Sequence, residues 1–530
     1  MQVIPAAMSQ FSNGWVNAMH LAWLSLLRFY QSKALEIHFL SNIRNNQSMT
    51  KRFKPQYLPY NDTAHAVVET LAAKLSLTLN AATGAKHKAI LASFLYCVQE
   101  AGVGAFLNWS GGTTSQDTTG FSFFPAAGAA TIKSVRAKLV AAGYITNHDD
   151  LPSGFAEWSN KEAKKLMGFE QAERIKQANT YRINEMPLFD GPCLASAQFV
   201  DAQRPYVMVN QPEEYTDKFE RKAANRKAPK LSYSEVYKGK QGRQASAAAK
   251  PVKEMNSFWA KHPLVLPATN TDKAKHFACA TRIFHNGSLI SGGRWYGGWT
   301  NLKSHKRLYM RIDDEPICEI DLNASQPTLF SSLLGIRMNV GGDTWTDVYS
   351  SVVERLDAHE EPRLLRMMVK QVLVEMLGSG NYKRTGPANT DAPRKPLDFD
   401  DVQLFFDTDY SRGMYLQIQR EALDVFPALE KLNTKYHNTT GFLSYHESEI
   451  LTLTLLKLKT LGVVAYGVHD CVVVKQQDKD IAVETYREII RNYVIKYQRD
   501  NKHPHLNIKV SITIEQSGLD KVKLAGCYIR

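Results

Sequence analysis

The chain has 530 residues, of which 44% are hydrophobic, and its formal net charge is +13. This length exceeds one ordinary domain, so two or three domains are expected, and the hydrophobic content is that of a globular protein. The charge surplus indicates a polyanionic partner, with nucleic acid ahead of an anionic membrane, although a merely basic protein would show it too.

The six cysteines are scattered, with no C-x-x-C pair and no His and Cys cluster at zinc-site spacing. A disulfide framework and a structural zinc site are therefore not expected, and a reducing compartment fits best. No apolar run reaches the length that crosses a bilayer. The stretch Trp15–Tyr30 is apolar-rich, but polar residues interrupt it and no signal-peptide cleavage site follows. We interpret 1–61 as an N-terminal extension, with little function expected before Met49.

Residues 62–190 combine helical periodicity with two extended segments. Apolar residues recur three and four positions apart over 64–77 and 86–100, which predicts two amphipathic helices. A short basic helix then ends before Gly143, and an extended segment follows. A loop leads from there to a returning strand over 180–184.

This succession of helices and strands resembles a winged helix-turn-helix domain. In such a domain the basic helix would present Lys133, Arg136 and Lys138 to DNA. A small helical domain with a solvated basic face is the alternative interpretation.

Residues 191–254 are interpreted as a basic linker or a reduced thumb domain. Between 218 and 253 there are eleven Lys and Arg residues against Glu220 and Glu235, a surplus of nine. The Ala, Ser, Gly and Gln content near 240–250 is typical of a mobile segment. Contact with a phosphate backbone needs such charge but no fixed fold, and a solvated linker would look the same.

Two acids follow buried strands in the C-terminal half, predicted as one domain over 255–530. The apolar strand 317–322 carries Asp321 near its end and leads into a turn and an apolar helix. Two apolar strands within 463–474 meet at Asp470, which predicts a β-hairpin with an acid at its tip. If these strands are sheet neighbours, the two carboxylates can hold two Mg²⁺ ions about 4 Å apart.

A helix predicted over 360–377 lies between the two acids. Acids and a proline mark its start, and a glycine follows its end. Arg363, Arg366 and Lys370 share one face at spacings of three and four, which suits a triphosphate. An exposed basic face with no ligand is the alternative.

In this order the segments resemble the family A DNA polymerases and the related single-subunit phage RNA polymerases, over residues 280–516. The matching motifs are Ile320-Asp321-Leu322-Asn323 (motif A), Arg366 and Lys370 (motif B), His469-Asp470 (motif C), and Arg294 and Asn301 in the segment upstream of motif A. The helix 447–459 matches the template-side helix, and a strand over 506–515 would complete the sheet. The likeness is greatest to compact, divergent members from phages and mobile elements.

The resemblance implies an α+β fold, with an antiparallel palm sheet and helical fingers, behind the winged-helix-like domain. It implies that Asp321 and Asp470 bind two Mg²⁺ ions, or Mn²⁺ in their place. Arg363, Arg366 and Lys370 would hold the triphosphate, with Lys370 also placed to protonate pyrophosphate. Arg294 and Asn301 would follow the primer-template, and His469 would touch the primer terminus.

Three departures from the family are visible. The region that usually ends motif B with Tyr-Gly contains Leu377-Gly378-Ser379-Gly380 instead, so the aromatic residue is missing. No proofreading acids are found in the N-terminal half. Residues 381–440 match no family segment.

One position bears on the choice of sugar. The residue five after the motif A aspartate excludes a ribose 2′-hydroxyl when it is bulky, and it is glycine in the RNA polymerases. This chain has Gln326 there, or Pro327 if the register slips by one, and either favours deoxynucleotides.

The predicted function is therefore a DNA polymerase that extends a primer 3′-hydroxyl, for replication of a phage or mobile element in the cytoplasm of a bacterial host. Its partners would be primer-template, nucleoside triphosphates and duplex DNA at the N-terminal domain, with no membrane. Two alternatives stay open: a single-subunit RNA polymerase or primase-like enzyme, and a non-catalytic DNA-binding replication initiator.

Overall fold

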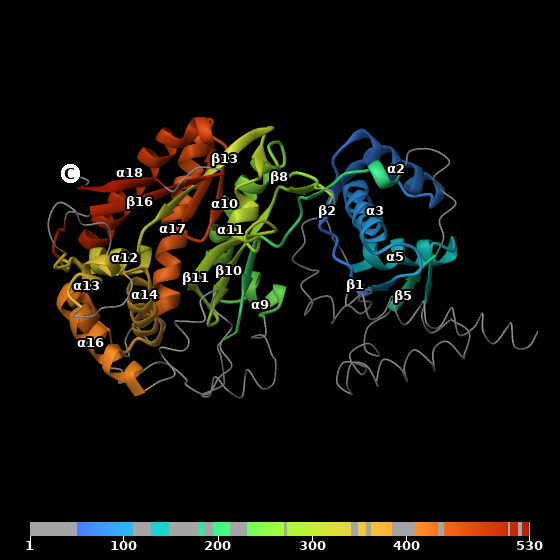
Figure 1. The fold of residues 1–530 in the computed structure, drawn as a ribbon. Coiled ribbons are helices and arrows are strands. Elements are labelled where there is room, and N and C mark those ends of the chain that lie inside the picture. Colours follow the sequence, from blue (N-terminus) through green and yellow to red (C-terminus); the bar gives the residue numbers. More distant parts are fainter. Residues whose placement is uncertain are drawn as a thin grey trace, which may run out of the picture. The chain divides into compact units, whose positions relative to one another are not determined.

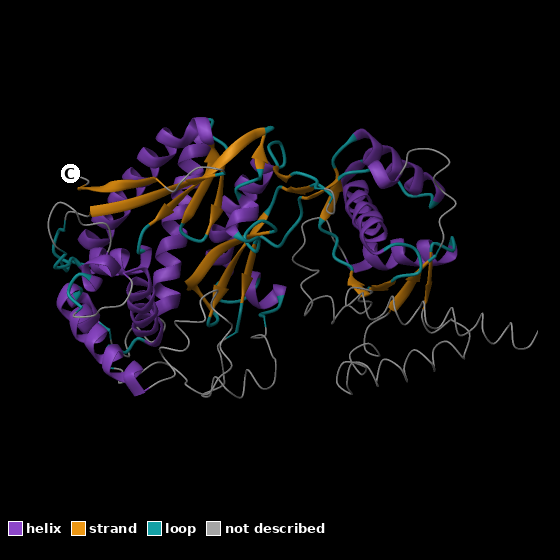
Figure 2. Cartoon of the chain, viewed as in Figure 1, coloured by secondary structure: helices purple, strands orange, loops and turns teal. Residues whose placement is uncertain are grey.

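Figure 1 shows the fold in a computed structural model. The residues that the structure describes are 50–109, 129–147, 180–184, 194–211, 230–269, 273–340, 348–356, 362–383, 409–432, 439–506, 509–517 and 522–528. Most of the N-terminal extension, the wing loop, and the linker cations Lys218, Arg221, Lys222, Arg226 and Lys227 lie outside the described residues, as does much of 381–440. The protein is a mixed assembly of sheets and helices (Figure 2).

The chain divides into two compact units. The first comprises 1–53, 97–109 and 139–186, and the second holds the remaining residues. The division falls within two helices, α3 (Ala81–Ala101) and α5 (Ala129–Ala141), and the second unit contains all elements from residue 187 onward.

The first unit contains a four-stranded sheet in the order β1-β3-β5-β4. Its strands are β1 (Thr50–Arg52), β3 (Phe106–Asn108), β4 (Ile145–Asn147) and β5 (Thr180–Ile183). Strand β1 runs parallel to β3, and the other pairs are antiparallel. The strands predicted after Gly143 and at 180–184 are thus confirmed, and Gly143 itself has φ +75°, which suits a helix-ending glycine.

Three helices accompany these strands along the chain. Helices α2 (Asp62–Lys74) and α3 lie between β1 and β3, and α5 lies between β3 and β4. Asn61 begins α2 by accepting a hydrogen bond from the Ala64 amide, which satisfies one of the free donors at that end. In α5, Ile132 and Val135 are buried at a spacing of three, and the polar residues between them are exposed. The predicted amphipathic and basic helices are present.

The largest sheet of the second unit is antiparallel around β13 (Glu315–Leu322). Strand β13 pairs with β15 on one side and with β16 on the other. The neighbouring strands are β14 (Ala465–Val468), β15 (Cys471–Lys475), β16 (Lys509–Gln516) and β17 (Val522–Tyr528). The long helices α17 (Thr439–Thr460) and α18 (Lys479–Asp500) pack against each other and against these strands. Val, Ile and Leu residues of the two helices and of the strands together form the core.

The same sheet continues from β13 through shorter strands in the order β12-β8-β9-β6-β2. These are β12 (Arg311–Ile312), β8 (Leu264–Leu266), β9 (Lys275–Phe277), β6 (Phe199–Asp201) and β2 (Tyr57–Pro59). A separate three-stranded sheet has the order β11-β10-β7, with β11 (Ser288–Gly297), β10 (Ala280–His285) and β7 (Val207–Val209).

Helix α10 (Gly242–Trp259) crosses the domain boundary expected at 254/255. Val252, Met255 and Trp259 of this helix belong to the core of the large sheet. With α9 (Tyr233–Tyr237) and strands β6 and β7, the described part of 191–254 is structured and is packed into the second unit. The Ala, Ser, Gly and Gln near 240–250, which are typical of a mobile segment, lie in this helix, and its apolar residues 252, 255 and 259 form the buried face.

A helical cluster with its own core completes the second unit. Its members are α12 (Ser325–Leu334), α13 (Val348–Val353), α14 (Pro362–Ser379), α16 (Asp409–Val425) and the short η4 (Pro427–Lys431). The remaining short elements are η3 (Leu194–Ser196), α11 (Ser304–Arg307) and η6 (Gln476–Asp478). Among the described helices, none has the length and hydrophobicity to cross a membrane.

Candidate active site

The two acids singled out in the sequence lie on paired strands. In the register of β13 with β15, Asp321 is opposite Cys471, the residue that directly follows Asp470. On the other side of β13, Asp321 is opposite Thr513 of β16. The sheet-neighbour condition for a shared site of Asp321 and Asp470 is therefore met.

Negative charge is concentrated around Asp321. Burial raises the pKa of the Asp321 carboxyl to about 7, and the charge of Asp470 is the next largest cause. Glu515 and Glu319 raise this pKa further, whereas the ammonium group of Lys370 lowers it. A bound cation would relieve the same repulsion, because it neutralises the carboxylates without protonating them.

The side chains that could bind a metal here, Asp321 and Asp470, suit Mg²⁺. Carboxylate oxygens are hard donors, and Mg²⁺ is commonly held by one or two protein carboxylates together with substrate phosphates and water. Within the described ranges, no group of three or more His, Cys, Asp or Glu residues is arranged to hold a metal by itself. Asp321 and Asp470 would thus form a site that a phosphate ligand completes.

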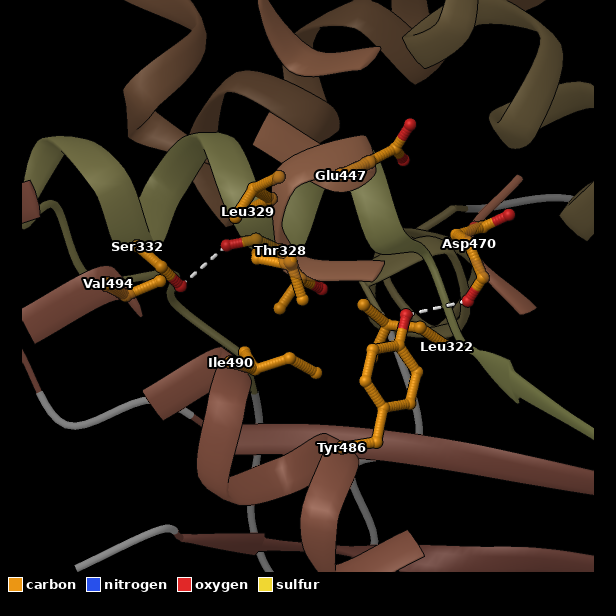
Figure 3. A pocket seen from close by; sticks show the side chains of 10 residues that line it. Leu322, Thr328, Leu329, Ser332, Glu447, Asp470, Tyr486, Ile490 and Val494 are labelled. Carbon is orange, nitrogen blue, oxygen red and sulfur yellow. Dashed lines mark hydrogen bonds between the residues drawn. The ribbon is translucent and has the colours of Figure 1, made fainter. Parts of the chain in front are cut away.

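The hairpin tip that carries Asp470 is fixed from two sides. Tyr486 of α18 donates a hydrogen bond of 2.7 Å to the Asp470 carbonyl oxygen (Figure 3). At the outer edge of β14, the indole of Trp299 donates to the Gly467 carbonyl at 2.9 Å, and that of Trp259 to the Ala465 carbonyl at 2.8 Å. Among the described strands none pairs with the outer edge of β14, and these bonds give carbonyls of that strand a partner.

His469 precedes Asp470 at the tip and has a left-handed backbone, with φ +59°. Burial, followed by the charge of Arg294, lowers the pKa of the His469 imidazole, which is therefore neutral at neutral pH. Its ring meets the Tyr296 ring edge-on, with 6.0 Å between centroids. The side chain can therefore offer a hydrogen bond rather than a charge.

Arg294 reaches the site from an irregular strand. Gly292 and Gly293 have φ +80° and +78°, and the register of β11 with β10 shifts beside them. A Cβ atom on Gly293 would lie 2.7 Å from the Phe284 ring, so the close approach also requires glycine. The bulge places the guanidinium of Arg294 against Glu447 in α17.

Glu447 was missed as a site residue from the sequence, where only its helix was singled out. Its side chain accepts short hydrogen bonds from Arg294 Nη2 and Ser325 Oγ. Gln326 Nε2 lies 3.5 Å from the same carboxylate. Only 4% of Glu447 is exposed, although its helix also carries Ser448 and Glu449 beside it. The local sequence therefore gives no signal that separates Glu447 from its polar neighbours, and its burial is what identifies it.

Gln326 and Pro327, the two candidates for the sugar position, have different surroundings in the structure. Gln326 is partly exposed at the start of α12 and faces Glu447, whereas Pro327 is buried in the helical cluster. Of the two registers considered for the sugar position, the structure therefore brings Gln326 to the site.

The three cations predicted on one helix have different surroundings. Lys370 is exposed on α14, and its charge acts on Asp321. The guanidinium of Arg366 lies over the Tyr349 ring, 5.3 Å from its centroid, and Arg363 is exposed one turn earlier. Lys370 is thus the member of this set whose charge acts on Asp321.

The predicted primer-template residue Asn301 is exposed in the turn after β11.

One residue predicted to contact DNA in the N-terminal region, Lys138, has hydrogen-bond partners within the chain. Lys138 Nζ donates to the Leu75 carbonyl at 2.8 Å and to the Ser76 carbonyl at 3.2 Å. Carbonyls at the end of a helix lack partners within it, so the half-buried Lys138 stabilises the end of α2. Lys133 is exposed and Arg136 is half-buried on α5.

An apolar cavity of about 10 Å³ lies next to the acids and is at the lower limit for a single water molecule. Figure 3 shows Glu447 and Asp470 toward one side of it, with Ser332 and Val494 toward the other. The cavity is a packing gap and is too small for a nucleotide.

The comparisons with known proteins give little. No protein-family model matches the chain, and no curated protein matches it. Among solved structures, the chain is similar to the POL domain of Pol1 from M. smegmatis in complex with DNA primer-template and dNTP. The identity is 12% and the TM-score is 0.30, and the match spans 58% of this chain and 58% of that one. A likeness at this TM-score establishes neither fold nor activity.

Proposed function

We propose that this chain is a template-directed DNA polymerase of the family A type, which adds deoxynucleotides to a primer 3′-hydroxyl. The observation that carries the proposal is the pairing of β13 with β15, which brings Asp321 and Asp470 together within reach of the charge of Lys370. In this proposal the antiparallel sheet is the palm and the helical cluster with α14 forms the fingers.

Asp321 and Asp470 would hold two Mg²⁺ ions, or Mn²⁺ in their place. When bound, such ions activate the attacking hydroxyl and stabilise the charge on the leaving phosphate oxygens. Lys370 would hold the triphosphate and is placed to protonate pyrophosphate, with Arg363 and Arg366 on the same helix. Neutral His469 would contact the primer terminus, and Arg294 and Asn301 would follow the primer-template, with Arg294 nearer the terminus.

Gln326 favours deoxynucleotides over ribonucleotides in this proposal. It has a bulky side chain, it lies at the start of α12 four residues after the end of β13, and it is held near Glu447. A single-subunit RNA polymerase or primase-like enzyme would use the same acids, and incorporation of rNTPs in place of dNTPs would identify it.

The N-terminal elements support a second, accessory part of the proposal. The chain order of helix α5, then strands β4 and β5, which pair with each other, supports this part, because a winged helix has a helix followed by such strands. In this proposal α5 would be the recognition helix and would present Lys133 and Arg136 to duplex DNA. Replication of a phage or mobile element is the role that we propose for this combination. A non-catalytic replication initiator would keep this DNA binding but show no nucleotide addition.

The first prediction tests the acids. Asp321→Asn and Asp470→Asn should each lower the rate of primer extension by about three orders of magnitude or more, because two-metal stabilisation of the transition state contributes several kcal/mol. The measurement is single-nucleotide extension with dNTPs and, separately, rNTPs. Asp313→Asn, which removes an exposed acid that pairs with His262, is the control and should retain the wild-type rate. Retention of a tenth of the rate by either site variant would exclude the assignment.

A further inference from the structure

Glu447 connects Arg294, the proposed primer-template contact, with Gln326, the proposed sugar contact. Its carboxylate binds Arg294, and Oε2 of the same group lies 3.5 Å from Gln326. The other oxygen accepts from Ser325, which directly precedes Gln326. We propose that Glu447 is a positioning residue that couples sugar selection to engagement of the primer terminus, an inference that rests on the polymerase function.

The position of Glu447 does not depend on its own hydrogen bonds. The next two residues of α17, Ser448 and Glu449, are held by the buried guanidinium of Arg282, at 2.8 Å and 2.7 Å. Arg282 Nε donates in turn to the Gly293 carbonyl at 2.7 Å, within the bulge that positions Arg294. The helix and the bulged strand are therefore locked together, and Glu447 is presented from a rigid element.

The chemistry of the three neighbours requires an acceptor. Arg294 carries only donors, and the hydroxyl of Ser325 and the amide nitrogen of Gln326 are both oriented as donors to Glu447. A carboxylate accepts at both oxygens, so one group can satisfy all three. Burial raises the pKa of the Glu447 carboxyl, the charge of Arg294 opposes this rise, and the charge of Asp470 adds to it. The network therefore adjoins the proposed catalytic acids.

The consequence is a shared constraint. A correctly placed primer terminus would hold Arg294, and through Glu447 it would hold the amide of Gln326 where a 2′-hydroxyl must pass. When the terminus is displaced, Arg294 and Gln326 can no longer both bond to the Glu447 carboxylate. Discrimination against ribonucleotides and affinity for the primer should then fall together.

The experiment compares two substitutions of similar size in the full chain. Glu447→Met removes the acceptor, and it should lower the ratio of kcat/KM for dNTP over rNTP by about three- to tenfold, the value of one hydrogen bond. It should raise the KM for primer-template by a similar factor. Glu447→Gln keeps one acceptor oxygen toward Arg294 and Gln326, and should stay within about twofold of the wild-type sugar ratio. Lys457→Gln, at an exposed position of the same helix, is the control and should leave both quantities unchanged.

A double-mutant cycle decides whether Glu447 acts through Gln326. Gln326→Ala and Glu447→Met together should lower the sugar ratio no more than Gln326→Ala alone. Additive effects, or an unchanged ratio in Glu447→Met, would overturn the coupling. If Glu447→Met does not fold, Glu447→Asp supplies the test, because it keeps the charge but withdraws it from Gln326, and an unchanged ratio there overturns the proposal as well. Failure of the wild-type chain to extend a primer would instead exclude the polymerase function itself.

Discussion

Asp321 shows at the scale of one residue why a site is costly to keep. Its carboxyl is held among Asp470, Glu515 and Glu319, and its raised pKa reflects the burial and repulsion that the fold tolerates there. A group that destabilises its own fold is typical of a functional residue, since function is selected at the expense of stability. Stability measurements therefore bear on the site independently of catalysis.

The second prediction uses this destabilisation. A carboxyl whose pKa is about 7 in the folded chain and has its ordinary lower value in the unfolded chain reduces stability as pH rises between the two values. Asp321→Asn removes this loss, so the variant should melt at a higher temperature than the wild type at about pH 8, with a smaller difference at about pH 5. The measurement is thermal unfolding with a chelator present. A difference of equal size at both pH values would contradict the explanation.

The third prediction concerns His469, whose left-handed backbone is strained for a residue other than glycine. His469→Gly should keep or increase the free energy of unfolding, by up to about 1 kcal/mol, while lowering the rate of primer extension because the imidazole no longer meets the primer terminus. Lys502→Gly is the matched control: it relieves φ +56° in an exposed turn and should leave activity unchanged. Full activity in His469→Gly would remove this residue from the site.

At the scale of elements, the hairpin β14–β15 is held by two indole hydrogen bonds in addition to its strand pairs. Three tryptophans of the same core are fully buried, and the indoles of Trp259 and Trp299 bond to carbonyls of β14. The third, Trp295, donates to the Thr452 hydroxyl of α17 instead. An edge strand held in this way keeps Asp470 in place without an additional strand.

The fourth prediction follows from this arrangement. Trp299→Phe leaves the Gly467 carbonyl buried without its partner, which should lower the free energy of unfolding by about 1–3 kcal/mol. The rate of primer extension should fall as well, because the hairpin tip loses a support. Denaturant unfolding and primer extension are the measurements. Trp295→Phe provides the comparison, with a similar loss of stability but a smaller loss of activity, and the reverse ranking would count against the role of β14.

At the scale of the whole molecule, the unit that carries the acids also includes segments from before residue 255. Helix α10 and strands β6 and β7 belong to the body that carries the acids, so a fragment beginning at 255 would cut a core helix. Strand β2 pairs with β6, so residues 57–59 also belong to the large sheet. Tests of the N-terminal region are therefore best made in the full chain.

The fifth prediction separates three kinds of basic residue in that chain. Lys133→Gln should weaken binding to a preferred duplex more than to a random one, because a base contact discriminates sequences by about 1–3 kcal/mol. Neutralising Lys218, Arg221 and Lys222 should instead reduce the salt dependence equally on all duplexes, by about 0.9 in slope for each phosphate that is no longer neutralised. Lys138→Met should lower the melting temperature without changing sequence preference, since its ammonium group bonds to carbonyls of the chain. Salt titrations on several duplexes test all three, and the absence of duplex affinity at low salt would rule out the winged-helix function.

The sequence by itself determined the elements that carry Asp321 and Asp470, because a short continuous apolar run next to an acid is a local pattern. It also determined the helices and the returning strand near the N-terminus, whose periodicity, caps and glycine act over a few residues. The tertiary structure alone decided that Glu447 joins Arg294 to Gln326, that Lys138 holds the end of α2, and that Arg366 lies over Tyr349. Each of these contacts joins residues far apart along the chain, and their partners depend on how strands and helices pack, which periodicity and charge do not encode. The same limit hid helix α10, whose Ala, Ser, Gly and Gln content is typical of a mobile segment, while its apolar residues pack into a core that distant strands supply.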